Sequence, residues 1–98
     1  MPLTSSQKRY LRGLAHPLHP LVMVGQKGVT APLLAELAIA LEHHELVKVK
    51  IANEDRDERS EWTAELLDKS GAELVQSVGR VATLYRRRRD KPAITLPK

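Results

Sequence analysis

The stretch LVMVGQKGVT, residues 21–30, constrains the fold of this chain more than any other. Four apolar residues predict a short strand, and a Gly-x-x-Gly turn then leads into a helix that Thr30 is suited to cap. Gly25 and Gly28 permit positive φ and leave the turn without Cβ atoms, so another molecule can approach the main chain closely. Backbone N–H groups, the positive end of the helix dipole and Lys27 would meet there, as in a phosphate-binding loop. The alternative is that the glycines serve only the geometry of a strand-to-helix turn, because a lone Gly-x-x-Gly is a weak motif.

Charge is divided along the chain in a way that the net value of +4 conceals. The first 35 residues contain four basic residues and no acid, and residues 36–73 hold eleven of the twelve acids. Residues 74–98 then carry seven basic residues against one acid. Basic ends around an acidic middle indicate a folded domain with one positive face, for which nucleic acid is the commonest partner. A membrane surface fits less well, since one Trp and no Phe are present to anchor a basic amphipathic helix.

Composition excludes several classes of protein. A chain of 98 residues with 42% hydrophobic residues suffices for one domain, residues 1–98, with one modest core. It has no run of eighteen apolar residues and no apolar segment typical of a secretory signal, so we expect a cytoplasmic protein. Because cysteine is absent, disulfides, thiolate metal sites and a Cys nucleophile are excluded. Nothing in the sequence indicates an oligomer, and we expect a monomer.

Catalysis and metal binding are not expected either. His16 and His19 are separated by a proline, and His43 and His44 are adjacent and would point apart, so no three ligands converge. His43 is better interpreted as a cap at the end of the second helix. No nucleophile elbow or Walker loop accompanies the serines, which argues against an enzyme with a small-molecule substrate. We therefore expect no metal and no other cofactor.

Hydrophobic periodicity predicts the order α-β-α-β-α-β-β, which is an α/β (α+β) chain with a small mixed sheet. Helices are expected over about 5–15, 30–43 and 59–70, and strands over 21–24, 46–51, 73–78 and 81–86. The all-apolar first strand should be covered on both faces, whereas the second should turn Lys48 and Lys50 to solvent. Tyr10, Leu11 and Leu14 are expected to form the apolar side of the first helix.

The third helix and the end of the chain carry further signals. Trp62, Leu66 and Leu67 should be the buried edge of that helix, and Gly71 should end it. Gly79-Arg80 is expected to form a two-residue hairpin turn with Gly79 first, as in a type II′ turn. Residues 90–98 are expected to form a C-terminal tail that can dock on the body through Ile94 and Leu96.

Several segments together resemble a known family. The segments are LRGLAHPL at 11–18, VGQKGVT at 24–30, ALEHHELVKVKI at 40–51, VGRV at 78–81, LYR at 84–86 and ITLP at 94–97. They are similar, in order and over essentially the whole chain, to the bacterial YhbY proteins, which consist of a single CRM domain. The resemblance implies a four-stranded mixed sheet backed by helices, like the C-terminal domain of bacterial translation initiation factor three. It also implies an RNA-binding protein associated with precursors of the large ribosomal subunit, in which the Gly-x-x-Gly loop contacts RNA.

The candidate RNA-binding residues follow from the motif, the charge and the resemblance. They are Gly25, Gln26, Lys27 and Gly28 in the loop, Lys8, Arg9 and Arg12 on the first helix, and Arg86, Arg87 and Arg88 in an arginine run that ends at Arg89. Each group has a plainer interpretation, as a solvated helix face for the second group and a soluble tail for the third. Lys48 and Lys50 are interpreted as the wet face of a strand. With three aromatic residues in all, recognition of phosphates is expected to dominate over stacking of bases. The alternative is a protein-binding adaptor on ribosomal particles that makes no direct RNA contact.

Overall fold

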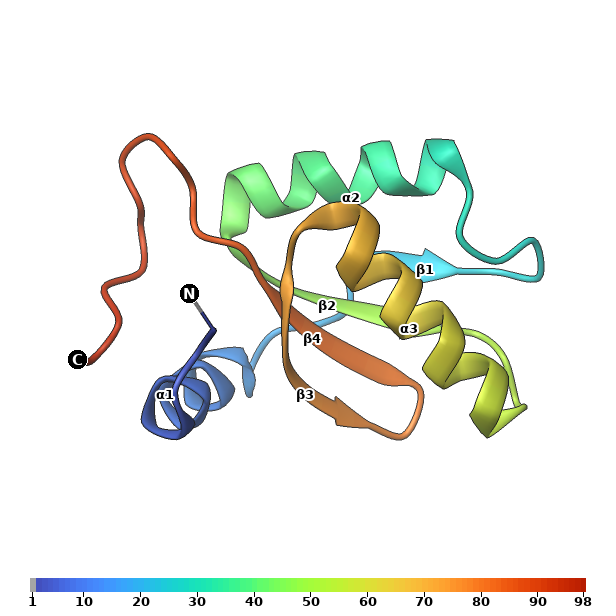
Figure 1. Ribbon diagram of the computed structural model, residues 1–98, viewed down its shortest axis with the longest axis horizontal. Helices are drawn as coiled ribbons and strands as arrows, with labels where there is room; N and C mark the ends of the chain where they lie inside the picture. The colour runs from blue at the N-terminus through green and yellow to red at the C-terminus, as the bar shows by residue number, and fades with distance from the viewer. Residues whose placement is uncertain (1) are drawn as a thin grey trace.

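The computed structural model describes residues 2–98 and contains, in that part of the chain, three helices and four strands in the predicted order (Figure 1). The elements are α1 (Ser5–Ala15), β1 (Val22–Val24), α2 (Ala31–His44), β2 (Leu46–Ile51), α3 (Arg56–Ser70), β3 (Glu73–Val78) and β4 (Val81–Tyr85). The strands form one sheet in the order β1-β2-β4-β3, with β1 parallel to β2 and both other pairs antiparallel. The predicted α+β class with a four-stranded mixed sheet is confirmed.

The main core lies between one face of the sheet and the helices α2 and α3. Val47, Val49 and Ile51 alternate along β2 into this core and are at most 2% exposed. Leucines spaced four residues apart on α2 meet them, namely Leu33, Leu37 and Leu41. Each fully buried side chain of this kind contributes about 1.5–3 kcal/mol. The alternation that was expected for β2 therefore leaves its other face, with Lys48 and Lys50, turned away from α2 and α3.

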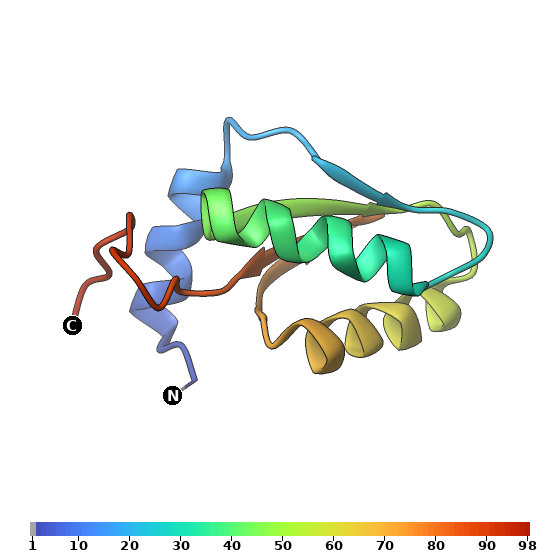
Figure 2. The same cartoon turned by 90° about the horizontal axis from the view of Figure 1, so that it is seen from above.

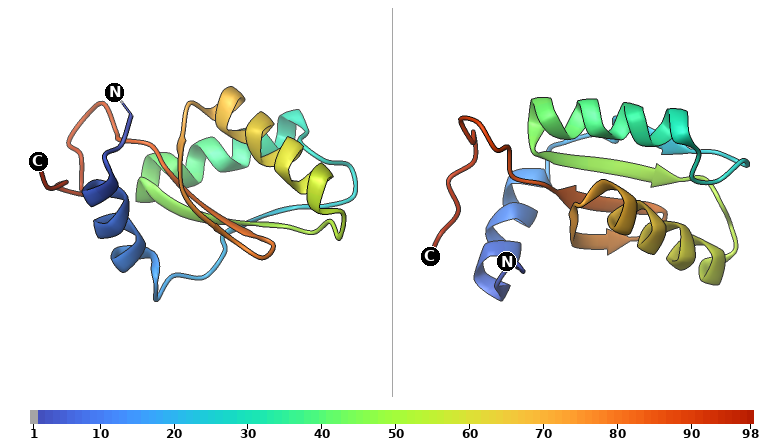
Figure 3. Two further views of the ribbon diagram at one scale, coloured as in Figure 1. Left: turned by 60° about the horizontal axis from the view of Figure 1, so that its bottom comes forward. Right: turned by 45° about the horizontal axis from the view of Figure 1, so that its top comes forward.

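Helix α1 packs against the opposite face of the sheet, at one end of it (Figure 3). Its buried side is formed by Leu11 and Ala15, which cluster with Leu46, Val75 and Tyr85. Thr4 caps the helix and forms a reciprocal capping box with Gln7. The tail completes this cluster, since Ile94 and Leu96 pack against it as expected.

Glu45 fastens the tail to the body of the protein. It ends α2 at φ +60° and is fully buried. Its carboxylate accepts the backbone N–H groups of Arg88, Ala93 and Ile94 at 2.9, 2.8 and 2.8 Å. Burial alone would raise the pKa of Glu45, but these three hydrogen bonds and the nearby charge of Arg88 hold that pKa below its ordinary value. The carboxylate is thus ionised where it holds the tail, and the residue that ends the helix is Glu45 rather than His43.

Two expectations about the N-terminal half were wrong. Strand β1 is covered on one face only, because it is an edge strand and α2 and α3 lie on one side of the sheet, so Leu21 and Met23 are 54% and 59% exposed. On α1, Tyr10 and Leu14 are also exposed, because the helix turns Ala15 rather than these residues toward the sheet alongside Leu11. These residues give the protein an apolar surface that its sequence did not indicate.

Helix α3 begins at Arg56, three residues earlier than expected. Asp55 caps it by accepting the N–H groups of Asp57 and Glu58, which draws the acid-rich connection into the first turn. Leu66 is fully buried, whereas Trp62 and Leu67 are half-buried at the edge of the core. The helix ends at Gly71, as predicted.

The β3–β4 hairpin has the turn that was predicted. Val78 pairs with Val81, so only Gly79 and Arg80 lie between the strands. Gly79 has φ +58° and Arg80 is not among the residues with positive φ, as a type II′ turn requires.

Candidate functional site

The GxxG loop, residues 25–28, forms a tight turn between β1 and α2. The N–H of Gly28 donates to the carbonyl of Gly25 at 3.0 Å, and Gly28 has φ +73°. Gly28 is buried, whereas Gln26 and Lys27 at the tip are exposed. The two glycines therefore differ in role, because only Gly28 needs its positive φ while the tip presents Gln26 and Lys27 to solvent.

The start of α2 contributes fewer free N–H groups than the sequence suggested. Thr30 accepts the N–H of Leu33 through its side chain at 3.3 Å and that of Leu34 through its carbonyl at 3.0 Å. Pro32, in the first turn, has no N–H. The N–H groups of Gln26 and Lys27 donate to no other described residue, so the amides that could bind an anion belong to the tip of the loop.

The predicted basic residues of α1 lie far from this loop. Figures 1 and 2 both place α1 at one end of the long axis and the GxxG loop at the other, and this axis spans 37 Å. The structure therefore does not bring Lys8, Arg9 and Arg12 together with Lys27. The arginine run, residues 86–89, follows β4 at the α1 end, so it too lies away from the loop.

A strip of the sheet connects the two ends. We call it the open face: it is the part of the sheet covered neither by α2 and α3 nor by α1, and it presents Met23, Lys48, Lys50, Gln76 and Val78. Lys48 shares a groove of about 270 Å³ with Arg12 of α1. Met23 pairs with Lys50 next to the strand end from which the GxxG loop emerges. Basic side chains thus run from α1 across β2 to the loop.

None of these cations is neutralised inside the described chain. Residues 2–98 contain three ion pairs: Lys69–Glu65, Arg80–Glu54 and Arg86–Glu42. None of them involves Lys27, Lys48, Lys50 or the basic residues of α1. The acids that follow β2 are used elsewhere, since Asp55 caps α3 and Glu54 pairs with Arg80.

Lys48 and Lys50 are the functional candidates that the sequence interpretation passed over. By itself, the sequence favours an ordinary wet strand face for them, with acids close by in the chain. The signal was nevertheless present, because a strand of alternating pattern places both lysines on one face. What the sequence did not indicate was that this face would join α1 to the loop.

The arginine run divides into two kinds of residue. Arg86 donates to the carbonyl of Ser70 at 2.9 Å and lies 3.7 Å from the carboxylate of Glu42. Arg88 donates through its guanidinium to the carbonyl of Glu42 at 3.3 Å. Both side chains are half-buried against the end of α2, whereas Arg87 and Arg89 are exposed. Of the predicted Arg86, Arg87 and Arg88, only Arg87 has a side chain free to reach a ligand.

Among residues 2–98, no three His, Cys, Asp or Glu side chains lie close enough together to hold a metal ion. Over the same residues, no helix has the length and apolar character needed to cross a membrane.

Comparison with known proteins identifies the family. The CRS1 / YhbY (CRM) domain family matches residues 3–86. An RNA-binding protein of Haemophilus influenzae is 44% identical over 84 residues, which are 86% of this chain and 85% of that protein. The Bacillus subtilis protein YqeI, named as a probable RNA-binding protein, is 36% identical over 95 residues, or 97% of this chain and 99% of its own. The names of these relatives describe RNA-binding proteins, not enzymes.

A solved structure agrees with both the fold and the family. The solution structure of the hypothetical protein SAV1595 from Staphylococcus aureus, described as a candidate RNA-binding protein, superposes with a TM-score of 0.83 at 35% identity. The match covers 97% of this chain and 99% of that one. The long family match and the two relatives, each more than 30% identical over most of its length, lead to one conclusion: this chain belongs to the CRS1/YhbY (CRM) domain family.

Proposed function

We propose that this protein binds RNA, and that the sugar–phosphate backbone of the RNA runs from α1 across the open face to the GxxG loop. The observation that carries the proposal is the row of basic side chains without acidic partners, which are Lys8, Arg9, Arg12, Lys48, Lys50 and Lys27. Unneutralised cations in a row are the electrostatic footprint of a nucleic-acid site. The names of the relatives from H. influenzae and B. subtilis support RNA as the ligand.

The chemistry favours recognition of the RNA backbone over recognition of base sequence. Lysine and backbone N–H groups contact phosphates, which position RNA without reporting its sequence. Tyr85 is buried, Trp62 is half-buried, and the exposed Tyr10 lies on α1 rather than on a strand, so the sheet itself presents no aromatic platform for stacking bases. At the loop, the exposed Lys27 ammonium and the free amides of the tip bind one or two phosphates.

Within this proposal the RNA is ribosomal RNA in precursors of the large subunit, and the protein acts in their assembly as a monomer. The basis is the resemblance of the whole sequence to the bacterial YhbY proteins. Crosslinking in growing cells, followed by sequencing of the bound RNA, tests it. We expect reads concentrated in the large-subunit rRNA, and reads scattered over all transcripts would contradict the ribosomal role.

RNA binding itself is tested by fluorescence anisotropy with a labelled single-stranded RNA over a range of salt concentrations. If several phosphates are contacted, log K falls with log salt by about 0.7 for each single-stranded phosphate. Duplex DNA of the same length serves as competitor. A salt-independent affinity, or equal competition by DNA, would contradict the proposal.

One observation favours a second function, binding of a protein partner. Leu14, Leu18 and Leu21 are 39%, 40% and 54% exposed and line a groove of about 420 Å³ between α1 and β2. Exposed apolar clusters of this kind mark interaction sites on soluble proteins. An adaptor that uses this groove would stay on ribosomal particles after nuclease digestion. Loss of the protein after digestion would contradict the adaptor function.

A further inference from the structure

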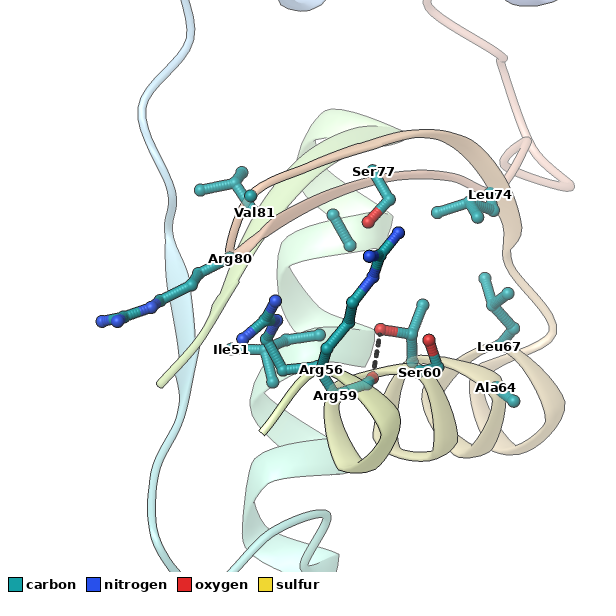
Figure 4. A pocket seen from close by; sticks show the side chains of 13 residues that line it. Ile51, Arg56, Arg59, Ser60, Ala64, Leu67, Leu74, Ser77, Arg80 and Val81 are labelled. Carbon is teal, nitrogen blue, oxygen red and sulfur yellow. Dashed lines mark hydrogen bonds between the residues drawn. The ribbon is translucent and has the colours of Figure 1, made fainter. Parts of the chain in front are cut away.

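A further cleft lies between α3 and the β3–β4 hairpin, on the other side of the sheet from the open face (Figure 4). Its volume is about 670 Å³, within the range of about 300–1,000 Å³ of small-molecule sites. In Figure 4, Ser60, Ala64 and Leu67 line the α3 wall, and Leu74 and Ser77 line the strand wall. The apolar part of the lining is formed by Ile51, Ala64, Leu67, Leu74, Val81 and Ala82.

The charge of the cleft is opposite to that of its surroundings. Three arginines line it, Arg56, Arg59 and Arg80, and no acid does. Yet the segment that contains α3 carries most of the acids in the chain. Helical geometry of 3.6 residues per turn explains the separation, because the acids of α3 share the side turned away from the cleft; they are Asp57, Glu58, Glu61, Glu65 and Asp68. Helix α3 is therefore sorted by charge, with its cationic side on the cleft.

The three arginines differ in how free they are. Arg59 is held by the carbonyls of Asn53 and Glu54, at 2.8 and 3.0 Å, and has a structural role. Arg80 extends outward from the turn and lies 3.4 Å from the exposed carboxylate of Glu54, a contact that costs little to break. Arg56 is exposed and forms no hydrogen bond or ion pair with another side chain of residues 2–98. Arg56 is thus available to a ligand at the mouth of the cleft, and Arg80 reaches the same ligand by turning from the outward direction seen in Figure 4.

The mouth lies at the same end of the sheet as the GxxG loop. The N–H of Ile51 donates to the carbonyl of Arg80 at 2.7 Å, and the N–H of the next residue, Ala52, donates to the carbonyl of Val24 at 2.9 Å. The end of β2 therefore lies between the hairpin turn on one side and the start of the loop on the other.

We propose that this cleft binds a nucleoside phosphate, with the base on the apolar floor and the phosphate on Arg56 and Arg80. The guanidinium group is planar, so it binds a phosphate through two parallel hydrogen bonds and also stacks on a base. Ser60 and Ser77 supply hydroxyl groups for the sugar. A bare anion would leave the apolar floor unused, and an apolar ligand would leave the arginines unused. A nucleotide uses both.

The site is separate from the open face, so it does not depend on RNA binding there. The nucleotide has two possible sources, a free nucleotide or a nucleotide of an RNA chain that passes the hairpin turn. The chemistry of recognition is the same for both. The experiment therefore separates the two sources.

NMR titration of the ¹⁵N-labelled full chain tests the proposal. The probes are AMP, GMP, CMP and UMP, with inorganic phosphate as the probe that lacks a base. We expect a mononucleotide to shift the amide signals of Ser60, Ala64, Ser77 and Gly79 and to bind at least tenfold more tightly than phosphate. Signals of Lys27 and Lys50 report on the open face at the same time.

Substitutions locate the binding. Arg56→Ala with Arg80→Ala should lower mononucleotide affinity at least tenfold, whereas Arg87→Ala with Arg89→Ala, the matched loss of two exposed charges at the other end, should leave it within twofold. Ala64→Leu, which fills the floor from an exposed helix position, should weaken binding of the nucleotide and spare that of phosphate. Circular dichroism checks that each variant is folded.

An RNA oligonucleotide identifies the source. Shifts at the cleft with RNA, and RNA affinity lowered by the Arg56 and Arg80 substitutions, would assign the nucleotide to the RNA chain. Cleft shifts with mononucleotides alone would assign it to a free nucleotide. The proposal is overturned if neither probe shifts the cleft signals, or if phosphate binds as tightly as every mononucleotide. Failure of the open-face function is seen separately, as RNA that leaves Lys27 and Lys50 unshifted.

Discussion

Gly28 and Trp62 lie against each other, and this contact seats the GxxG loop on α3. A Cβ atom at Gly28 would lie 3.3 Å from two carbons of the indole, and the residue has φ +73°. Around Gly25, by contrast, a Cβ would meet nothing within 4 Å. The motif therefore combines a glycine required by packing and backbone conformation with one that leaves space for another molecule.

The two glycines should respond differently to alanine. We expect Gly28→Ala to lower the free energy of unfolding by about 1–3 kcal/mol, which is the usual cost of left-handed backbone strain. The new methyl group should also displace the indole of Trp62. Gly25→Ala, the matched control, should change the free energy of unfolding by less than about 0.5 kcal/mol. Denaturant unfolding followed by Trp62 fluorescence measures both. Equal losses for the two variants would contradict the distinction.

Lys27 should account for one phosphate contact. Because it is exposed and has no partner among the described ion pairs, Lys27→Gln should leave stability unchanged while lowering RNA affinity. The slope of log K against log salt should become shallower by about 0.7. Anisotropy titrations at several salt concentrations measure both quantities. A slope that stays the same would show that Lys27 does not contact a phosphate.

Glu45 should make the docked tail sensitive to acid. Its pKa is lowered in the folded protein, so its contribution to stability is present above the unfolded-state value near 4.5 and is lost as pH falls through the folded-state pKa. Glu45→Gln cannot accept all three N–H groups, since its amide turns a donor toward one of them. The wild type should therefore be more stable than this variant by about 1.5–3 kcal/mol above about pH 5, with the difference shrinking as the pH falls below the unfolded-state value toward the lowered folded-state pKa.

Urea unfolding of both proteins at each pH gives this difference directly. Acids other than Glu45 are common to the two proteins, so their titration cancels. A difference that does not change with pH would mean that ionisation of Glu45 is not what holds the tail.

The arginine run should separate into stabilising and exposed residues. Arg86→Ala removes hydrogen bonds to the carbonyls of Ser70 and Ala38, so we expect a loss of about 1–2 kcal/mol in the free energy of unfolding. Arg87→Ala, the exposed neighbour, should leave stability within about 0.5 kcal/mol. If the run also contacts RNA, only the Arg87 variant should lower RNA affinity without lowering stability. Thermal unfolding and anisotropy together decide between these roles.

The sequence was sufficient to predict elements whose signals are local. The leucine spacing of α2, the alternation of β2 and the Gly79-Arg80 turn each depend on neighbouring residues, and the structure confirms all three. The start of α3 is less predictable, because an acid in a polar stretch, such as Asp55, can equally belong to a loop. The two hydrogen bonds of Asp55 to the first turn of α3 became visible only in the structure.

The candidate site was less predictable because it depends on which distant segments meet. Lys27 and Arg12 both belong to the acid-free first 35 residues, yet the fold places the GxxG loop and α1 at opposite ends of the molecule. Lys48 and Lys50 join them only because α1 covers one end of the sheet and leaves the rest open. Similarly, the sequence places Arg86 in a charged run, but its guanidinium donates to the carbonyls of Ser70, at the end of α3, and of Ala38, within α2. Contacts between segments that are distant in the sequence, rather than local patterns, determine where these basic side chains lie.

The central claim is that RNA crosses the open face, and Lys50 tests it most directly. Lys50→Glu reverses one exposed charge there, and Lys69→Glu reverses one on α3, away from the open face, where it also breaks the ion pair with Glu65. By fluorescence anisotropy at one salt concentration, we expect Lys50→Glu to lower RNA affinity at least about tenfold, or 1.4 kcal/mol, and Lys69→Glu to lower it by less than about twofold. Equal losses of RNA affinity in the two variants would mean that only the net charge of the protein matters. An unchanged affinity for Lys50→Glu would contradict the proposed RNA path.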